Sequence, residues 1–206
     1  MIWYHWLAIG SLGFCLANCF FHFLMLVKLG KPTDLSEKRG NTNAAIVYAF
    51  TGAMSPTKKE SAFLHLPTYT AGLLYHVGTF LSIFVFIMLF LGIAIEGWFA
   101  YTIAAILLIS GISGAAILIK RIIKKQLRDL SNPDDYISNL LVTFVQFLSI
   151  AAILNHIFLP VYFVLASILF LYLPLGKLKH TIYFFAARYH LGIFYGWRGV
   201  WPPQQK

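Results

Sequence analysis

The chain contains five apolar windows that are each long enough to cross a lipid bilayer. They cover about residues 6–27, 73–95, 100–119, 136–157 and 161–180. A hydrocarbon core is about 30 Å thick, and about 20 helical residues at 1.5 Å each span it. Backbone groups in lipid have no water to bond with, so the windows are predicted to be helices. We therefore expect an all-α integral membrane bundle of five transmembrane helices, with residues 1–206 in one domain.

Composition also indicates a bilayer as the solvent. Hydrophobic residues make up 59% of the chain and charged residues 11%, with a mean hydropathy of +0.75. A soluble domain of this size could not bury so much apolar surface. We expect a multi-pass protein of the cell's inner (plasma) membrane, in contact with membrane lipid.

The basic residues predict the orientation of the chain, because short cytoplasmic loops retain Lys and Arg. Three groups of them lie at the inner ends of the first, third and fifth windows or follow those windows: Lys28, Lys31, Lys38, Arg39, Lys58 and Lys59; Lys120, Arg121, Lys124, Lys125 and Arg128; Lys177, Lys179, Arg188, Arg198 and Lys206. We therefore expect the N-terminus outside and the C-terminus cytoplasmic, with a cytoplasmic tail at 181–206. The net charge of +9 follows from this topology, and no compact basic domain exists to bind nucleic acid.

Three segments between or after the windows carry structural signals. Residues 44–54 form a short amphipathic stretch, either a surface helix or a docking surface for a cytoplasmic subunit. Residues 131–135 combine a turn with acidic side chains, and this pattern predicts the cap of a helix. The tail is rich in aromatic residues and Arg, which suits either the membrane interface or packing on a partner protein.

The histidines are the most informative polar residues, because such side chains are costly inside membrane helices. His76 lies inside the second window, and His180 lies at the inner end of the fifth. Both are expected at a similar depth, and two histidines on different helices can ligate one heme iron from opposite faces. Lys177, Lys179 and Arg188 would then border the heme propionates. A plain interfacial position remains the alternative for His180.

Cysteine usage excludes two kinds of redox centre within this chain. Cys15 and Cys19 are its only cysteines. They form neither the C-x-x-C-H motif of covalent heme attachment nor a set of thiolates for an iron–sulfur cluster. Any iron–sulfur chemistry is therefore expected in a partner.

Three segments, 73–78, 131–136 and 174–180, resemble a family of membrane cytochrome b subunits. The family includes the respiratory nitrate reductase gamma subunit, its relative in heterodisulfide reductase, and the transmembrane redox complexes of sulfate reducers. The resemblance covers roughly residues 60–200, and 195–199 is similar to the tail of the sulfate-reducer relatives.

The resemblance implies a b-type cytochrome, the electron-transfer subunit of a respiratory oxidoreductase complex. Such a subunit exchanges electrons between a membrane quinone, menaquinone or similar, and a cytoplasmic iron–sulfur subunit of a heterodisulfide-reductase-like complex. His76 and His180 match the ligands of the heme nearer the cytoplasm. Phe86 and Tyr162 stand where ligands of the outer heme would fall. We therefore expect one heme b.

Several alternatives remain open from the sequence. His5 and His156, both expected at the outer level, could replace the missing ligand pair. His65 is eleven residues, about 16 Å, from His76 on the same helix face. It could serve a quinone headgroup, a propionate or only the interface. The rival functions are a heme-free anchor of a redox complex and a small transporter, which the lack of charged residues within the windows disfavours.

Overall fold

The computed structural model describes residues 2–29, 34–55 and 65–203, and every regular element in these ranges is a helix. The chain divides into two compact units. The first unit contains Met1–Cys15 and Leu66–Leu178, and the second contains Leu16–His65 and Lys179–Lys206. The all-helical class predicted from the sequence is confirmed for the described residues.

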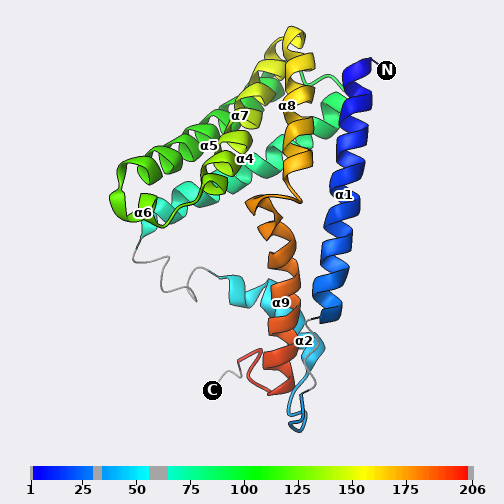
Figure 1. Ribbon diagram of the computed structural model, residues 1–206, viewed down its shortest axis with the longest axis vertical. Coiled ribbons are helices and arrows are strands. Elements are labelled where there is room, and N and C mark those ends of the chain that lie inside the picture. Colours follow the sequence, from blue (N-terminus) through cyan, green and yellow to red (C-terminus); the bar gives the residue numbers. More distant parts are fainter. Residues whose placement is uncertain (1, 30–33, 56–64, 204–206) are drawn as a thin grey trace. The chain divides into compact units, whose positions relative to one another are not determined.

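Four described helices are long and apolar enough to cross a membrane. They are α1 (Trp3–Leu29), α4 (Leu66–Phe90), α5 (Gly97–Ile123) and α7 (Pro133–Leu154) (Figure 1). A fifth span is present only if α8 (Leu159–Tyr172) and α9 (His180–Trp197) count together as one broken span. A chain with several helices of this kind is compatible with a multi-pass membrane protein.

The continuous helix predicted for 161–180 is wrong, because α8 already ends at Tyr172. Pro174 has no N–H to donate to the carbonyl four residues earlier, so the helix cannot continue through it. The chain turns at 173–176 and re-enters helix through the short 3₁₀ helix η4 (Lys177–Lys179). A Cβ at Gly176 would collide with the ring of Tyr172, so a larger residue in this turn would require that ring to move. The window missed the break because its residues stay apolar.

The bounds of α4 also differ from the predicted 73–95. The helix begins earlier, at Leu66, with Pro67 in the first turn, where its missing N–H costs nothing. It ends earlier because Gly92 adopts a left-handed conformation with φ of 70°. The N–H of Ile93 then bonds to the carbonyl of Met88 at 2.9 Å, as in a glycine-terminated helix.

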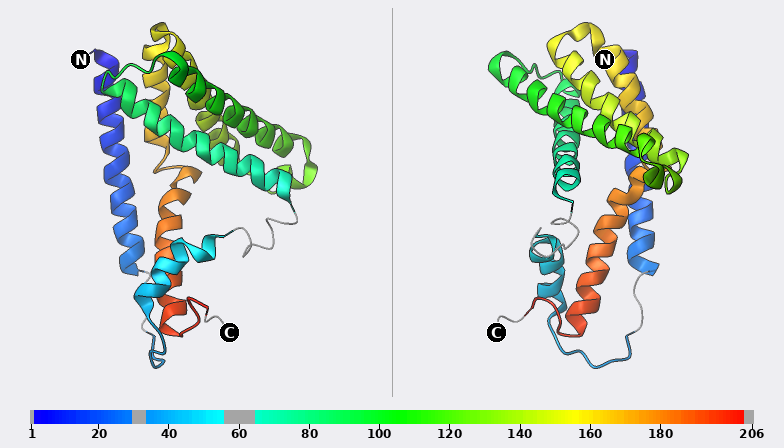
Figure 2. Two further views of the ribbon diagram at one scale, coloured as in Figure 1. Left: turned by 180° about the vertical axis from the view of Figure 1, so that it is seen from behind. Right: turned by 90° about the vertical axis from the view of Figure 1, so that its left-hand side faces the viewer.

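Within the first unit, α4, α5 and α7 pack side by side, with α8 against α7 (Figures 1 and 2). Glycines at the contacts let the helices approach closely. Gly78 faces Ser110, and Gly114 faces the ring of Tyr75. A Cβ at either glycine would clash with these side chains. Small residues at helix contacts are typical of membrane bundles, where close packing replaces hydrophobic association.

Within the second unit, the short helix α2 (Thr42–Phe50) lies against α9. Asn41 caps α2 by accepting the N–H groups of Asn43 and Ala44, and the 3₁₀ helix η1 (Gly52–Met54) follows. The stretch predicted at 44–54 is thus helical in its first part, while its place on a membrane surface and its docking role stay predictions. At its closest point, a Cβ on Gly192 would lie 2.5 Å from the Cα of Ile46.

The end of α9 is held by the segment that precedes α2. The indole N–H of Trp197 donates to the carbonyl of Ser36 at 2.8 Å, and Arg198 pairs with Asp34 at 2.8 Å. Hydrogen bonds from Ser36 hold the pKa of the Asp34 carboxyl below its usual range. The carboxylate, and with it the ion pair, therefore persists to a lower pH than an ordinary Asp would allow. Most of the predicted tail is thus a packed helix.

Substituting Gly192 by Leu should separate α2 from α9, because the added side chain meets the backbone of Ile46. We expect a loss of about 1–3 kcal/mol, the usual effect of overpacking. Thermal unfolding of the full chain in detergent measures this loss. Gly13→Leu in α1 is the matched control, since nothing lies within 4 Å of a Cβ there. Equal stability of the two variants would show that the contact contributes nothing.

Candidate functional site

The two residues at the predicted outer-ligand positions face each other in the first unit. The rings of Phe86 on α4 and Tyr162 on α8 lie 6.5 Å apart between centroids, and both side chains are buried. Phe170 and Phe163 complete the cluster, with centroids 4.9 and 5.7 Å from that of Phe86. Packed aromatic side chains therefore occupy the position between α4 and α8 where the resemblance would place an outer heme.

The alternative outer histidines have different surroundings. His5 belongs to the same aromatic cluster, because its ring stacks on Tyr4 at 4.6 Å and lies 5.0 Å from that of Phe163. Its Nδ1 is buried and has no hydrogen-bond partner among the described residues. His156 opens the 3₁₀ helix η3 (His156–Phe158) and is exposed. The second heme that these residues could hold stays untested.

A buried seam of polar groups fixes the rotation of α4. The carbonyl of Tyr75 accepts hydrogen bonds from the hydroxyls of Thr79 and Ser110, at 2.8 and 3.3 Å, and from the amide of Gln146 at 3.3 Å. The hydroxyl of Tyr75 donates to the carbonyl of Asn139 at 2.9 Å. Gln146 is fully buried. Ser110 comes from α5, and Asn139 and Gln146 come from α7, so the seam joins all three helices.

This seam places His76 on the other side of α4. Successive helical residues point about 100° apart, so a Tyr75 turned toward α5 and α7 directs His76 away from them. His76 is exposed, as are its apolar neighbours Leu73, Val77 and Phe80. The imidazole thus stands on an apolar face that the three-helix core does not use, which suits a ligand bound outside that core.

The position of His76 along α4 can be measured from the end of the helix. The ammonium group of Lys120, near the end of α5, donates to the hydroxyl of Thr68 in the first turn of α4. His76 follows Thr68 by eight residues, which corresponds to about 12 Å along the helix. His76 is therefore well inside the apolar part of α4, as the sequence predicts.

The remaining predicted site residues lie in or next to α9 and α4. His180 is the first residue of α9 and is exposed; Lys179 precedes it and is half-buried. The guanidinium group of Arg188 lies 5.6 Å from the ring centroid of Phe184. His65 is exposed and stands immediately before α4. His76 belongs to the first unit and these four residues to the second, so the pairing of His76 with His180 stays a prediction.

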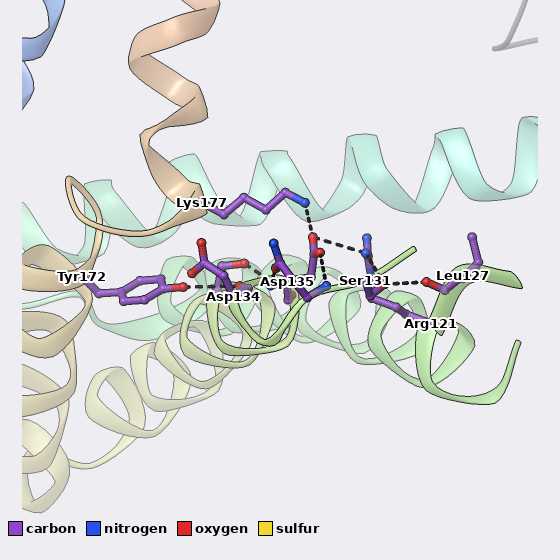
Figure 3. A network of polar contacts seen from close by, with 9 residues as sticks. Arg121, Leu127, Ser131, Asp134, Asp135, Tyr172 and Lys177 are labelled. Atoms are coloured by element: carbon purple, nitrogen blue, oxygen red, sulfur yellow. Dashed lines mark hydrogen bonds and ion pairs between the residues drawn. The ribbon is translucent and has the colours of Figure 1, made fainter. Parts of the chain in front are cut away.

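Asp135 is the centre of a charged cluster at the start of α7 (Figure 3). Its carboxylate accepts the backbone N–H of Asn132 in a capping box, so the helix cap predicted from the sequence is confirmed. The same carboxylate pairs with Arg121 at 3.3 Å and with the ammonium group of Lys177. Its side chain is only 5% exposed, so the two cations neutralise a charge that is largely removed from solvent.

Two further bonds tie the neighbouring segments to this cluster. Arg121 donates to the hydroxyl of Ser131 at 2.9 Å, and the hydroxyl of Tyr172 donates to the carbonyl of Asp134 at 3.3 Å. The turn that follows α8 is therefore fastened to α7 through Tyr172 and Lys177. The sequence did not predict the contacts of Tyr172 with Asp134 and of Lys177 with Asp135, because each joins residues about 40 positions apart. The turn residues beside Lys177 do not indicate that Asp135 is its ion-pair partner.

Larger metal sites are absent from the described ranges 2–29, 34–55 and 65–203. No three His, Cys, Asp or Glu side chains gather there in a way that could hold a metal ion. A heme needs only two axial ligands, so this finding does not bear on His76 and His180.

Comparisons with protein-family models, with curated proteins and with solved structures found no match for the chain. The resemblance to membrane cytochrome b subunits therefore rests on the quoted segments and stays a prediction.

Replacing Asp135 by Asn should destabilise the first unit by about 1–3 kcal/mol. The amide can still accept the N–H of Asn132, but Arg121 and Lys177 lose the charge that they share. Thermal unfolding in detergent measures the change. Asp129→Asn, an exposed acid at the end of the short helix α6 (Lys125–Asp129), is the control and should stay within about 0.5 kcal/mol of the unsubstituted chain. Indistinguishable variants would remove Asp135 from any structural role.

Proposed function

We propose that this chain is the membrane cytochrome b subunit of a respiratory redox complex, with one heme b ligated by His76 and His180. The observation that carries the proposal is the contact between Phe86 on α4 and Tyr162 on α8. The resemblance assigns each heme to the space between these two parts of the chain. Their outer positions do meet in the first unit, and aromatic rings fill the space there.

The residues available in the chain fit a heme at the inner position. Two neutral imidazoles provide axial ligands of the kind that low-spin b-type sites use. Lys179 and Arg188 supply positive charge for the propionates. The charge of Lys177 is already shared with Asp135, so its part at the propionates is smaller than the sequence predicts. When bound, the heme supplies one-electron transfer between a membrane quinone, such as menaquinone, and a cytoplasmic iron–sulfur subunit.

The chain's own residues would ligate the heme iron, bury the heme and give a quinone access to it. The polar seam around Tyr75 holds α4 in the rotation that presents His76 to its apolar side. His65, at the entry to α4, is the residue that we assign to the quinone headgroup. The basic residues at the ends of α1 and α5, Lys28, Lys120 and Arg121, mark the cytoplasmic side of the inner membrane in this proposal.

A heme-free membrane anchor is the second candidate. It is favoured by the closed packing of α4, α5 and α7, whose buried hydrogen bonds form without any cofactor. Such a bundle could hold a redox complex at the membrane while another subunit carries the electrons. The two candidates differ in a single observable, the absorbance of the purified chain.

Substituting His76 or His180 by Ala should each abolish the low-spin heme spectrum, because a bis-histidine site loses its character when either axial ligand is removed. Reduced-minus-oxidised absorbance of the purified chain measures this. His22→Ala is the control, since His22 lies on α1 and has no role in the proposed heme site. An unchanged spectrum in either ligand variant would contradict the assignment, and a chain with no heme at all would favour the anchor.

The number of hemes is a separate prediction. We expect one heme b per chain, because Phe86, Tyr162 and their aromatic neighbours fill the outer position. Heme extraction, quantified against protein mass, gives the ratio directly. A ratio of two would overturn the expectation, and loss of only the second heme in His5→Ala or His156→Ala would then identify its ligands.

A further inference from the structure

Helix α1 provides a depth scale for the second unit. Its 27 residues extend about 40 Å and are long and apolar enough to cross a membrane. Trp3 and Trp6, both exposed, stand near one end, and Lys28 stands near the other. Trp near one end and Lys at the other are typical of the two interfaces of a membrane span. The segment from Leu16 to Leu29 belongs to the same unit as α9.

Helix α9 runs beside this segment of α1 and in the same direction (Figures 1 and 2). The imidazole Nε2 of His190 lies 3.1 Å from the carbonyl oxygen of Leu26, which sets the two helices in register. Both helices rise about 1.5 Å per residue. His180, ten residues earlier, is therefore level with about Leu16, near the middle of α1. The first half of α9 thus lies beside apolar residues of a membrane-spanning helix.

The surface of α9 has the character of a membrane helix on both of its faces. One face packs on α2 through small residues, including Ala186, Gly192 and Gly196. Gly192 and Gly196 are four residues apart, the spacing at which membrane helices approach each other closely. The opposite face carries Tyr183, Phe184, Leu191 and Phe194, each 37–43% exposed. A helix on the surface of a soluble domain would present polar residues there.

We propose that α9 lies in the inner half of the membrane beside α1, and that its exposed aromatic face contacts the acyl chains of phospholipids. Trp197 lies seven residues beyond His190, about 10 Å past the level of Leu26, and is therefore at the phospholipid headgroups. The ammonium group of Lys38 lies 5.8 Å from its ring centroid, and Arg198 follows it. Trp beside Lys and Arg is the combination found at the membrane interface.

The same register explains the place of Arg188. It lies level with Leu24, about 6 Å inside the level of Lys28, and its guanidinium group stacks on the ring of Phe184. A long basic side chain at this depth can reach the headgroups or pair with an anion, while its aliphatic part stays in the apolar region. Binding of the aromatic face to a cytoplasmic partner protein is the competing explanation, and the contact between His190 and Leu26 argues against it.

The test is a nitroxide accessibility measurement on the full chain in phospholipid nanodiscs. In a background of Cys15→Ala and Cys19→Ala, a spin label is attached at Phe184→Cys. The register places Phe184 level with Phe20 on α1, which is 64% exposed and serves as the matched lipid control. Leu35, which is 94% exposed in the segment before α2, serves as the water control.

We expect the label at residue 184 to be accessible to oxygen and protected from a water-soluble nickel complex, with a depth within about one helical turn, 5.4 Å, of the label at residue 20. Nickel accessibility equal to that of residue 35 would overturn the proposal in favour of an aqueous helix. Protection from both reagents would overturn it in favour of burial against protein. Tyr183→Cys and Phe194→Cys on the same face replace a variant that does not fold. The measurement needs no heme, so its outcome is independent of the proposed function.

Discussion

Close contact between helices through small residues is the constraint on which both units depend. Lipid chains are as apolar as leucine, so helices in a bilayer gain little from burying apolar side chains against each other. Close approach and interhelical hydrogen bonds must hold them instead. In the first unit, Gly78 and Gly114 bring α4 and α5 together over the hydrogen bonds of Tyr75 and Gln146. In the second unit, Gly192 and Gly196 allow α9 to approach α2 closely.

This packing uses one side of α4 for contacts with α5 and α7 and leaves His76 on another side. The carbonyl of Tyr75 has two lone pairs and receives side-chain donors from two neighbouring helices in addition to Thr79 of its own. Rotating α4 would break these bonds inside a region without water, where unpaired polar groups cost several kcal/mol each. His76, the next residue, points about 100° away from Tyr75 and is consequently turned away from these bonds. A heme ligand at this position would gain an orientation that the first unit already fixes without the cofactor.

The sequence predicted those features that depend on local composition. Hydropathy placed α1, α4, α5 and α7, and the acidic turn at 131–135 placed the cap of α7. It did not predict the features that depend on geometry or on distant partners. A window average cannot detect that Pro174 stops α8. Residues 181–206 were predicted to be a tail because Arg188 and Arg198 were counted as loop charges, although α9 packs against α2. The buried hydrogen bonds around Tyr75 could have been suspected from Gln146, a polar residue within an apolar window. Counting charged residues in the windows did not reveal it, because glutamine is neutral.

The proposed heme and the proposed membrane position of α9 constrain each other. His76 lies about 12 Å along α4 from Thr68, where Lys120 marks the basic end of the neighbouring helix. His180 lies about 15 Å along α9 from His190, which is level with Leu26 near the basic end of α1. Each distance is measured within its own unit, and neither uses the placement of one unit against the other. A single iron with two axial imidazoles requires the two histidines to lie at one depth, so the proposed heme predicts that these two levels come together when the units assemble around it.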